Sequence, residues 1–263
     1  MKNSLDDSVL KSLDGTRAVL PYLPELLQDL WSMGSPPERS LELLRPLRLP
    51  PGSTRLLDLG CGKGAVSVRL ASELRFRVVG VDGCPEFLET AREKAEEFGV
   101  DGSCEFVCAD IRDFVKEARD FDAVILASVG NVLGGPGETV GRLRNCVRYG
   151  GYLLIDDGYL KSRGRFHHFK PHDETLSELL SHGDELVKEV ENPDDELARI
   201  NMSYLRDIRK RALILMDRKP GLSSVLQGYL RAQERECRSM ARHFRGATWL
   251  LRKAEPKAST GGS

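Results

Sequence analysis

Apolar and polar positions divide the chain into a helical start, a central alternation of strands and helices, and a helical C-terminal part. Short apolar runs bounded by turn residues predict five strands, at 55–59, 76–81, 104–108, 121–127 and 152–155. Segments with apolar residues at helical spacing predict helices between them, at 65–73, 85–98 and 139–147. Because several of these strands are apolar throughout, we expect a parallel sheet that is covered on both faces and joined by right-handed crossovers.

The flanking segments differ from this centre. Residues 1–51 form a helical extension broken by prolines, and the pattern after residue 161 predicts a short strand at 185–190, long helices within 194–245 and a last strand at 246–251. We therefore expect a main domain at 52–255 and a disordered polar tail at 256–263. The insertion at 194–245 is either a lid over an active site or an amphipathic pair that packs on the sheet or forms a dimer interface.

Composition excludes several classes of protein. The 39 basic and 40 acidic residues give a net charge of −1, which argues against a protein that holds nucleic acid through bulk charge. No apolar run approaches the roughly 20 residues of a membrane span, and Asp6 and Asp7 stand where a secretory signal would be apolar. The six cysteines include no Cys-x-x-Cys pair, so we expect reduced thiols in a soluble, cytoplasmic protein without a metal site.

The most informative segment is the glycine-rich turn that follows the first strand, Asp58-Leu59-Gly60-Cys61-Gly62-Lys63-Gly64. Glycines allow the backbone to turn tightly and let a ligand approach the amide groups. The helix that follows presents its N-terminal amides and the positive end of its dipole. Because the turn lies at the first strand–helix junction, it indicates a ligand site rather than a turn of purely structural importance.

Two acidic residues end the next two strands. Asp82 follows the second strand and can accept hydrogen bonds from ribose hydroxyls, although it can also cap the helix that starts at Pro85. Asp110 follows the third strand and could accept a hydrogen bond from an exocyclic amine while Ile111 packs on a flat ring. Its alternative role is again that of a helix cap.

Together these residues resemble the class I S-adenosylmethionine-dependent methyltransferases, over roughly residues 54–160. The turn at 58–64 matches the family's Asp-x-Gly-x-Gly-x-Gly motif, and Ala65 departs from the Gly-x-Gly-x-x-Gly spacing of dinucleotide enzymes, which disfavours nicotinamide-dependent reduction. The resemblance implies an α/β fold, a Rossmann-like sheet of seven strands with the last one antiparallel, for which 248–251 is the candidate. It implies S-adenosyl-L-methionine as the cofactor.

The resemblance also implies roles for individual residues. The cofactor's methionine part would lie against Asp58, Gly60, Cys61, Gly62 and Gly64. Asp82, with Gly83 beside it, would hold the ribose, Asp110 and Ile111 the adenine, and Ser128 would lie beneath the sulfonium. The segment Trp31-Ser32-Met33-Gly34 either caps this pocket or is an ordinary aromatic anchor.

The expected activity is methyl transfer to a small-molecule acceptor. Asp156, Asp157 and Tyr159 follow the fifth strand at the edge where such sheets bind ligands, and we take Tyr159, His167 and His168 as candidate catalytic residues. The histidines have the alternative of being exposed loop residues, and Pro171 disfavours a metal site at His168, His172 and Asp173.

Three alternatives concern the substrate and the assembly. The chain could methylate RNA or protein, or bind the cofactor without catalysis. Methylation of a nucleic-acid base is disfavoured, because Ser128-Val129-Gly130-Asn131 replaces the Asn/Asp-Pro-Pro-Tyr/Phe motif of amino-methylating DNA enzymes. A homodimer is a further possibility that the sequence leaves open.

Overall fold

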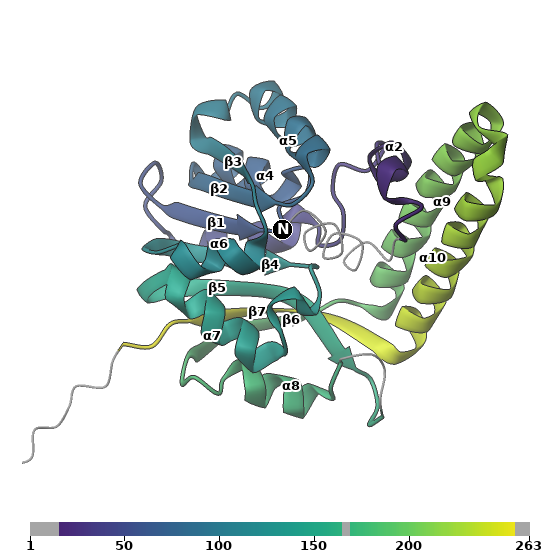
Figure 1. Cartoon of the computed structure of the whole chain (residues 1–263). Helices are drawn as coiled ribbons and strands as arrows, with labels where there is room; N and C mark the ends of the chain where they lie inside the picture. The colour runs from purple at the N-terminus through teal and green to yellow at the C-terminus, as the bar shows by residue number, and fades with distance from the viewer. Residues whose placement is uncertain (1–15, 165–168, 256–263) are drawn as a thin grey trace, which may run out of the picture.

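The centre of the molecule is a seven-stranded sheet with the strand order β3-β2-β1-β4-β5-β7-β6 (Figure 1). The structure, a computed structural model, describes residues 16–164 and 169–255, without the side chains of residues 194–197. The strands are β1 (Arg55–Leu59), β2 (Arg77–Asp82), β3 (Cys104–Cys108), β4 (Phe121–Ala127), β5 (Val147–Leu160), β6 (Glu185–Glu191) and β7 (Phe244–Arg252). β7 runs antiparallel to both of its neighbours, and the strands from β3 to β5 are parallel. The predicted Rossmann-like sheet with an antiparallel last strand is confirmed.

Helices cover both faces of the sheet, and alternate residues of each strand point to opposite faces. In β1, Leu57 belongs to the core beneath α6, α7 and α8, whereas Leu56 belongs to the core beneath α3 and α4. Both leucines are fully buried. The helices are α3 (Pro37–Leu44), α4 (Ala65–Leu74), α5 (Pro85–Glu97), α6 (Ile111–Glu117), α7 (Pro136–Cys146) and α8 (His172–Leu179).

The insertion forms a pair of long helices, α9 (Asp194–Arg218) and α10 (Ser223–His243), that projects beside α2 (Leu23–Leu26) (Figure 1). Its buried apolar stripe includes Ile208, Ala212 and Leu215, which pack with Leu23 and Leu26 in one hydrophobic cluster. The N-terminal extension therefore covers the stripe, and the helical pair and the extension are folded as one layer.

Two parts of the secondary structure differ from the prediction. β5 extends over 14 residues instead of four, because β7 pairs with it as far as Leu160. Asp156 and Asp157 consequently lie within this strand and not in a loop behind it. The helices α6 and α8 were not predicted, since both are short and carry few apolar residues.

Three further predictions concern membrane spans, cysteines and the tail. Within the described part of the chain, none of the helices has the length and apolar character that a bilayer span requires. All six cysteines are free thiols, in agreement with the prediction of reduced cysteines. The predicted tail at 256–263 lies outside the described residues.

The packing of the extension on the insertion predicts a difference between two leucines. Leu26 is 1% exposed and Leu213, on α9, is 58% exposed. We expect Leu26→Ala to lower the free energy of unfolding by about 2–5 kcal/mol, because it leaves a cavity in the shared core. Leu213→Ala is the control and should change it by less than about 0.5 kcal/mol. Urea denaturation of both variants measures this, and equal effects would show that the extension is not part of the folded core.

Candidate active site

The turn between β1 and α4 is built from glycines whose backbone conformation other residues rarely adopt. Gly60 has a φ of 74° and Gly62 a φ of 52°, both in the left-handed region. A Cβ on Gly60 would lie 2.5 Å from Cγ2 of Val129, so this glycine is required by close packing. A Cβ on Gly62 would meet only the Cε of Met33, at 3.1 Å. At Gly62, therefore, the turn is covered by the end of a flexible side chain and not by backbone.

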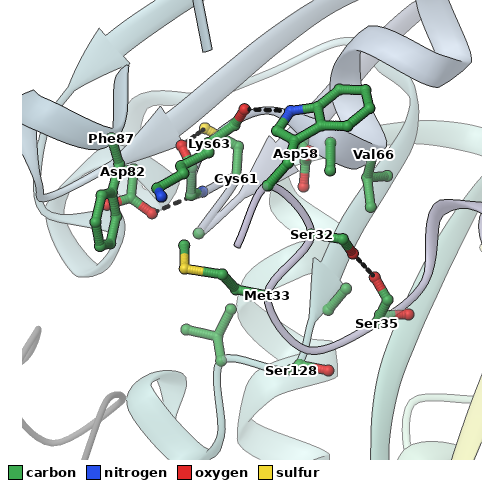
Figure 2. Close-up of a pocket in the computed structure, with 16 residues that line it drawn as sticks. Ser32, Met33, Ser35, Asp58, Cys61, Lys63, Val66, Asp82, Phe87 and Ser128 are labelled. Atoms are coloured by element: carbon green, nitrogen blue, oxygen red, sulfur yellow. Dashed lines mark hydrogen bonds between the residues drawn. The ribbon is translucent and has the colours of Figure 1, made fainter. Parts of the chain in front are cut away.

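A cavity of about 100 Å³ lies against this turn (Figure 2). We call it the cofactor cavity. Its wall combines the glycine turn, the end of β2, the loop after β4 and the segment 31–35 from the N-terminal extension. The lining residues are Trp31, Ser32, Met33, Ser35, Asp58, Gly60, Cys61, Gly62, Lys63, Ala65, Val66, Asp82, Phe87, Ala127, Ser128 and Val129.

Two buried carboxyl groups form part of this wall. Asp58 accepts a hydrogen bond from the Ser67 hydroxyl at 2.6 Å, and burial, with a smaller contribution from the charge of Asp82, raises the pKa of Asp58 to about 6. Asp82 accepts hydrogen bonds from the backbone N–H groups of Gly62 and Cys84, both at 2.9 Å. Burial also raises the pKa of Asp82. Among the described residues neither carboxyl has a cationic partner, so both are poised to meet a positively charged ligand.

The segment 31–35 is held on the glycine turn by a reciprocal pair of hydrogen bonds. The Lys63 ammonium donates to the carbonyl of Leu27 at 2.5 Å, and the Trp31 indole N–H donates to the carbonyl of Lys63 at 2.9 Å. Lys63 is 3% exposed, and burial lowers its pKa to about 8. Met33 points toward the glycine turn from this segment (Figure 2). Of the two alternatives for this segment, the structure shows the cap on the pocket.

Asp110 and Ile111 are not among the residues that line the cofactor cavity, although the neighbouring Ala109 backbone N–H donates to the carbonyl of Asp82 at 3.0 Å. Asp110 caps α6: its carboxylate accepts hydrogen bonds from the Arg112 backbone N–H and from the Arg112 side chain, both at 2.9 Å. The Arg112 side chain holds the pKa of Asp110 below its usual value. Ile111 is 7% exposed and belongs to the core of the sheet. Their part in adenine binding stays a prediction, as does the role of Gly64 and Gly83, which do not line this cavity.

A larger cavity of about 440 Å³ adjoins the first one and shares Ser35, Ser128 and Val129 with it. This volume is within the roughly 300–1,000 Å³ range of small-molecule sites. We call it the acceptor cavity; it lies between the ends of β4 and β5 and the helices α9 and α10. Its lining residues are Gly34, Ser35, Pro36, Ser128, Val129, Gly130, Asn131, Val132, Asp156, Asp157, Phe169, Asn192, Ile200, Asn201, Gln233, Glu236, Cys237, Met240, Phe244 and Gly246.

Ser128 lies at the boundary of the two cavities. Its φ of 56° places a non-glycine residue in the left-handed region, and its hydroxyl donates to Asp156 at 3.2 Å. The hydroxyls of Ser35 and Thr248 also donate to Asp156, each at 2.8 Å. The buried carboxylate of β5 thus connects the loop after β4, strand β7 and the capping segment in one hydrogen-bond network.

The predicted catalytic residues were Tyr159, His167 and His168. His167 and His168 lie outside the described residues. Tyr159 lines neither cavity: it is buried, and its hydroxyl donates to Glu191.

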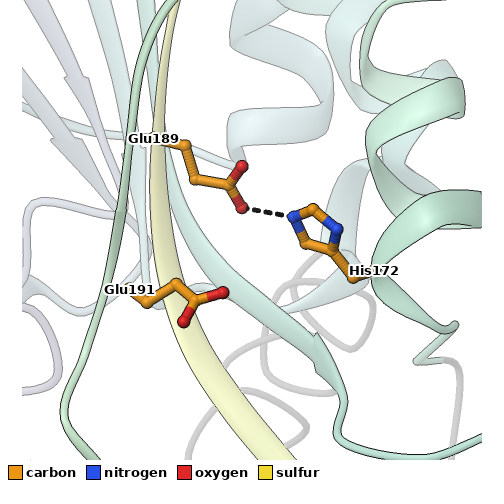
Figure 3. Close-up of side chains that lie close together, drawn as sticks. All are labelled: His172, Glu189 and Glu191. Carbon is orange, nitrogen blue, oxygen red and sulfur yellow. Dashed lines mark hydrogen bonds and ion pairs between the residues drawn. The ribbon is translucent and has the colours of Figure 1, made fainter.

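Next to Tyr159, the ring nitrogen Nε2 of His172 lies 2.7 Å from a carboxylate oxygen of Glu189 (Figure 3). Glu191 forms an ion pair with Arg245. The ligand atoms of His172, Glu189 and Glu191 lie within 4.8 Å of one another. These groups satisfy one another, so the geometry supports no role for Tyr159 in either cavity, and its catalytic role stays a prediction.

The pattern along the chain did not point to several residues of these walls. Lys63, Val66 and Phe87 line the cofactor cavity, and Asn201 and Gln233 line the acceptor cavity. Lys63 was part of the motif, but its spacing gave no indication that its side chain turns inward. Gln233 lies on the polar side of an amphipathic pattern, which is typical of solvent exposure.

Comparison with known proteins agrees with the geometry. Residues 52–211 match the model of the family described as "Methyltransferase domain", and the chain belongs to this family. A phosphatidylethanolamine N-methyltransferase from Cereibacter sphaeroides is 32% identical over 110 residues, which cover 42% of this chain and 53% of that protein. A ubiquinone biosynthesis O-methyltransferase from Methylocella silvestris is 35% identical over 156 residues, which cover 54% of this chain and 56% of that protein. The chain thus spans about half the length of these curated relatives.

Solved structures show the same fold over more of the chain. A SAM-dependent methyltransferase from Thiobacillus denitrificans, in complex with S-adenosyl-L-homocysteine, has a TM-score of 0.74 at 21% identity and covers 88% of this chain and 97% of that one. The YjhP protein of Escherichia coli has a TM-score of 0.73 at 19% identity, with 88% and 100% covered. The predicted resemblance to class I methyltransferases is confirmed at the level of family and fold.

Burial of Asp58 predicts a pH dependence of stability. Because its pKa is raised from 3.8 to about 6, the folded state binds the proton more tightly than the unfolded state. This contribution to stability is complete below about pH 4 and is lost as the pH rises to about 6. We therefore expect the free energy of unfolding of the wild type, measured relative to that of Asp58→Asn, to fall by up to about 3 kcal/mol across this pH window. Urea denaturation at pH 4, 5, 6 and 7 measures the difference; a difference that stays constant would contradict a raised pKa.

Proposed function

We propose that this chain transfers a methyl group from S-adenosyl-L-methionine to a small-molecule acceptor. The observation that carries the proposal is a pair of carboxyl groups, the buried Asp58 and the partly buried Asp82, beside a glycine turn that opens toward a second cavity at Ser128. Such acids are costly to bury without a positive partner. They therefore favour a ligand that is itself cationic.

The residues of the cofactor cavity suit this cofactor. S-adenosyl-L-methionine carries an ammonium group, a ribose and a positively charged sulfonium, whose methyl group it supplies when bound. Asp82 uses two of its roughly four acceptor positions for Gly62 and Cys84, which leaves capacity for ribose hydroxyls. Met33 occupies space in front of Gly62, and its flexible side chain can turn aside for a ligand.

The work of the protein in this reaction is alignment and exclusion of water. Trp31 and Met33 cover the cofactor cavity from the extension, and Phe87 and Val66 add apolar wall. Ser128 lies where the two cavities meet, at the place where the reacting groups would face each other. An acceptor in the larger cavity is therefore enclosed by α9, α10 and the end of the sheet.

The relatives support this class of reaction. The two curated proteins described above are named as an N-methyltransferase and an O-methyltransferase, and they match 42% and 54% of this chain. A cytoplasmic location stays a prediction. A homodimer also stays a prediction, for which the exposed Met202 and Leu213 on α9 offer apolar surface.

Gly62 provides the first test. We expect Gly62→Arg to abolish binding of S-adenosyl-L-methionine, because its side chain would fill the cofactor cavity. Gly102→Arg is the matched control, since a side chain at Gly102 meets open space at the far end of β3. Isothermal titration calorimetry with S-adenosyl-L-methionine compares the two. Unchanged affinity in Gly62→Arg would place the cofactor elsewhere.

Asp82 provides the second test. Asp82→Ala should weaken binding of S-adenosyl-L-methionine by about 1–3 kcal/mol, the usual effect of losing charge-assisted hydrogen bonds. Asp113→Ala, which removes an exposed carboxylate from α6, should leave the affinity unchanged. The same calorimetry measures both. A loss well below this range would assign Asp82 to bracing the glycine turn and not to ligand binding.

A further inference from the structure

The acceptor cavity carries two consecutive carboxyl groups on its wall, Asp156 and Asp157. The last residue pair between β4 and β5 joins Ala127 to Asp156. Because β5 continues beyond this pair, both carboxyl groups are available to the cavity. The two residues differ in their partners. Asp156 accepts hydrogen bonds from three hydroxyls, whereas the partner that Asp157 has among the described residues is the backbone N–H of Gly158. Asp157 therefore keeps capacity to bind a ligand.

The charges around these carboxyls are unbalanced. None of the described residues that line the acceptor cavity is a lysine or an arginine. Lys170 lines a smaller cavity next to Asp157 and pairs with Glu178. Arg39 of α3 has a weak influence on Asp156 and is held by Glu42 and Asn192. An anionic acceptor would have to enter against these acids, whereas a cationic one would be attracted.

The opposite wall offers a polar group without a partner. The side-chain nitrogen of Gln233, on α10, is buried and has no hydrogen-bond partner in the described structure. Gln233 and Asn201 both line the acceptor cavity and a further cavity of about 240 Å³ beneath α9 and α10. Buried polar groups are nearly always paired in proteins, so an unpaired amide on a cavity wall indicates a ligand atom that accepts its hydrogen bond. Phe169 and Phe244 add apolar surface to the wall of the acceptor cavity.

We propose that the acceptor is a small amine, whose ammonium group binds at Asp157 and Asp156 and whose far end accepts a hydrogen bond from Gln233. This inference rests on the methyl-transfer function proposed above and specifies its substrate class. The amine fits a cavity whose wall combines carboxyl groups, apolar side chains and a neutral hydrogen-bond donor. Asp157 is then the base of the reaction.

The step balances in atoms and charge. Asp157 takes a proton from the ammonium group, which exposes the nitrogen lone pair. That lone pair forms the new N–C bond to the methyl carbon while the S–C bond breaks, and the electron pair of the broken bond stays on sulfur as a neutral thioether. The product is a methylated ammonium ion. Burial, and then the charge of Asp156, raises the pKa of Asp157 to about 7, which suits proton transfer near neutral pH.

Three matched probes test the substrate class: tyramine, tyrosol and 3-(4-hydroxyphenyl)propanoate, which share a phenol ring and differ in an amine, alcohol or carboxylate end. We expect N-methyltyramine as the product with S-adenosyl-L-methionine, identified by mass spectrometry. We also expect tyramine to bind the protein saturated with S-adenosyl-L-homocysteine at least about tenfold more tightly than the other two, in calorimetry. Methylation of the phenol oxygen, equal binding of the three probes or no binding of tyramine overturns the proposal.

Variants separate the roles of the two walls. Asp157→Asn should remove the preference for tyramine in binding and the rise of kcat/KM with pH around 7 that its deprotonation causes. Gln233→Ala should weaken tyramine binding by about 3–10-fold, and Gln227→Ala, an exposed position on the same helix, should not. Unchanged tyramine binding in Asp157→Asn would overturn the proposal. If the protein still binds S-adenosyl-L-methionine in that case, the proposed methyl-transfer function stays in place. If the wild type does not bind S-adenosyl-L-methionine, the methyl-transfer function is overturned as well.

Discussion

The hydrogen bond from the Gly62 backbone N–H to the Asp82 carboxylate is the contact on which the site depends. Asp82 ends β2 and Gly62 lies in the turn after β1, and neighbouring parallel strands bring these two ends to one edge of the sheet. The backbone N–H groups of Gly60 and Cys61 add hydrogen bonds to the carbonyl of Val81, at 2.8 and 3.1 Å. The end of β2 therefore fixes the conformation of the whole turn, and the same carboxylate is left facing the cavity that the turn creates.

The N-terminal extension extends this arrangement to the helical layer. Leu23 and Leu26 pack with α9 and α10, and a few residues further on Leu27 and Trp31 exchange hydrogen bonds with Lys63 of the glycine turn. One segment thus connects the layer that covers the acceptor cavity to the turn that lines the cofactor cavity.

The sequence predicted the parts of this structure that depend on local pattern. The strands β1, β2 and β4 are mostly apolar, and the glycine turn is identified by its spacing, so the sheet and the position of the cofactor cavity could be predicted. The extent of β5 could not, because Asp156 and Asp157 interrupt its apolar pattern and the hydroxyls that stabilise Asp156 come from distant segments. Contacts such as that of Lys63 with Leu27 join residues far apart in the chain, and no periodicity reports them.

The buried acids form two sets on either side of Ser128, and this division is the strongest argument about the chemistry of the site. A carboxylate without a positive partner is costly to bury, and folding alone gives no reason for four of them at one edge of a sheet. Asp58 and Asp82 face a cavity beside a glycine turn, and Asp156 and Asp157 face a cavity beneath the helical layer. Three hydroxyl groups donate hydrogen bonds to Asp156, so the fold stabilises this carboxylate without a ligand. Among the described residues, no hydroxyl donates to Asp157 in this way. A cationic group of the acceptor would compensate the charge of Asp157, and the sulfonium would do the same for Asp58 and Asp82.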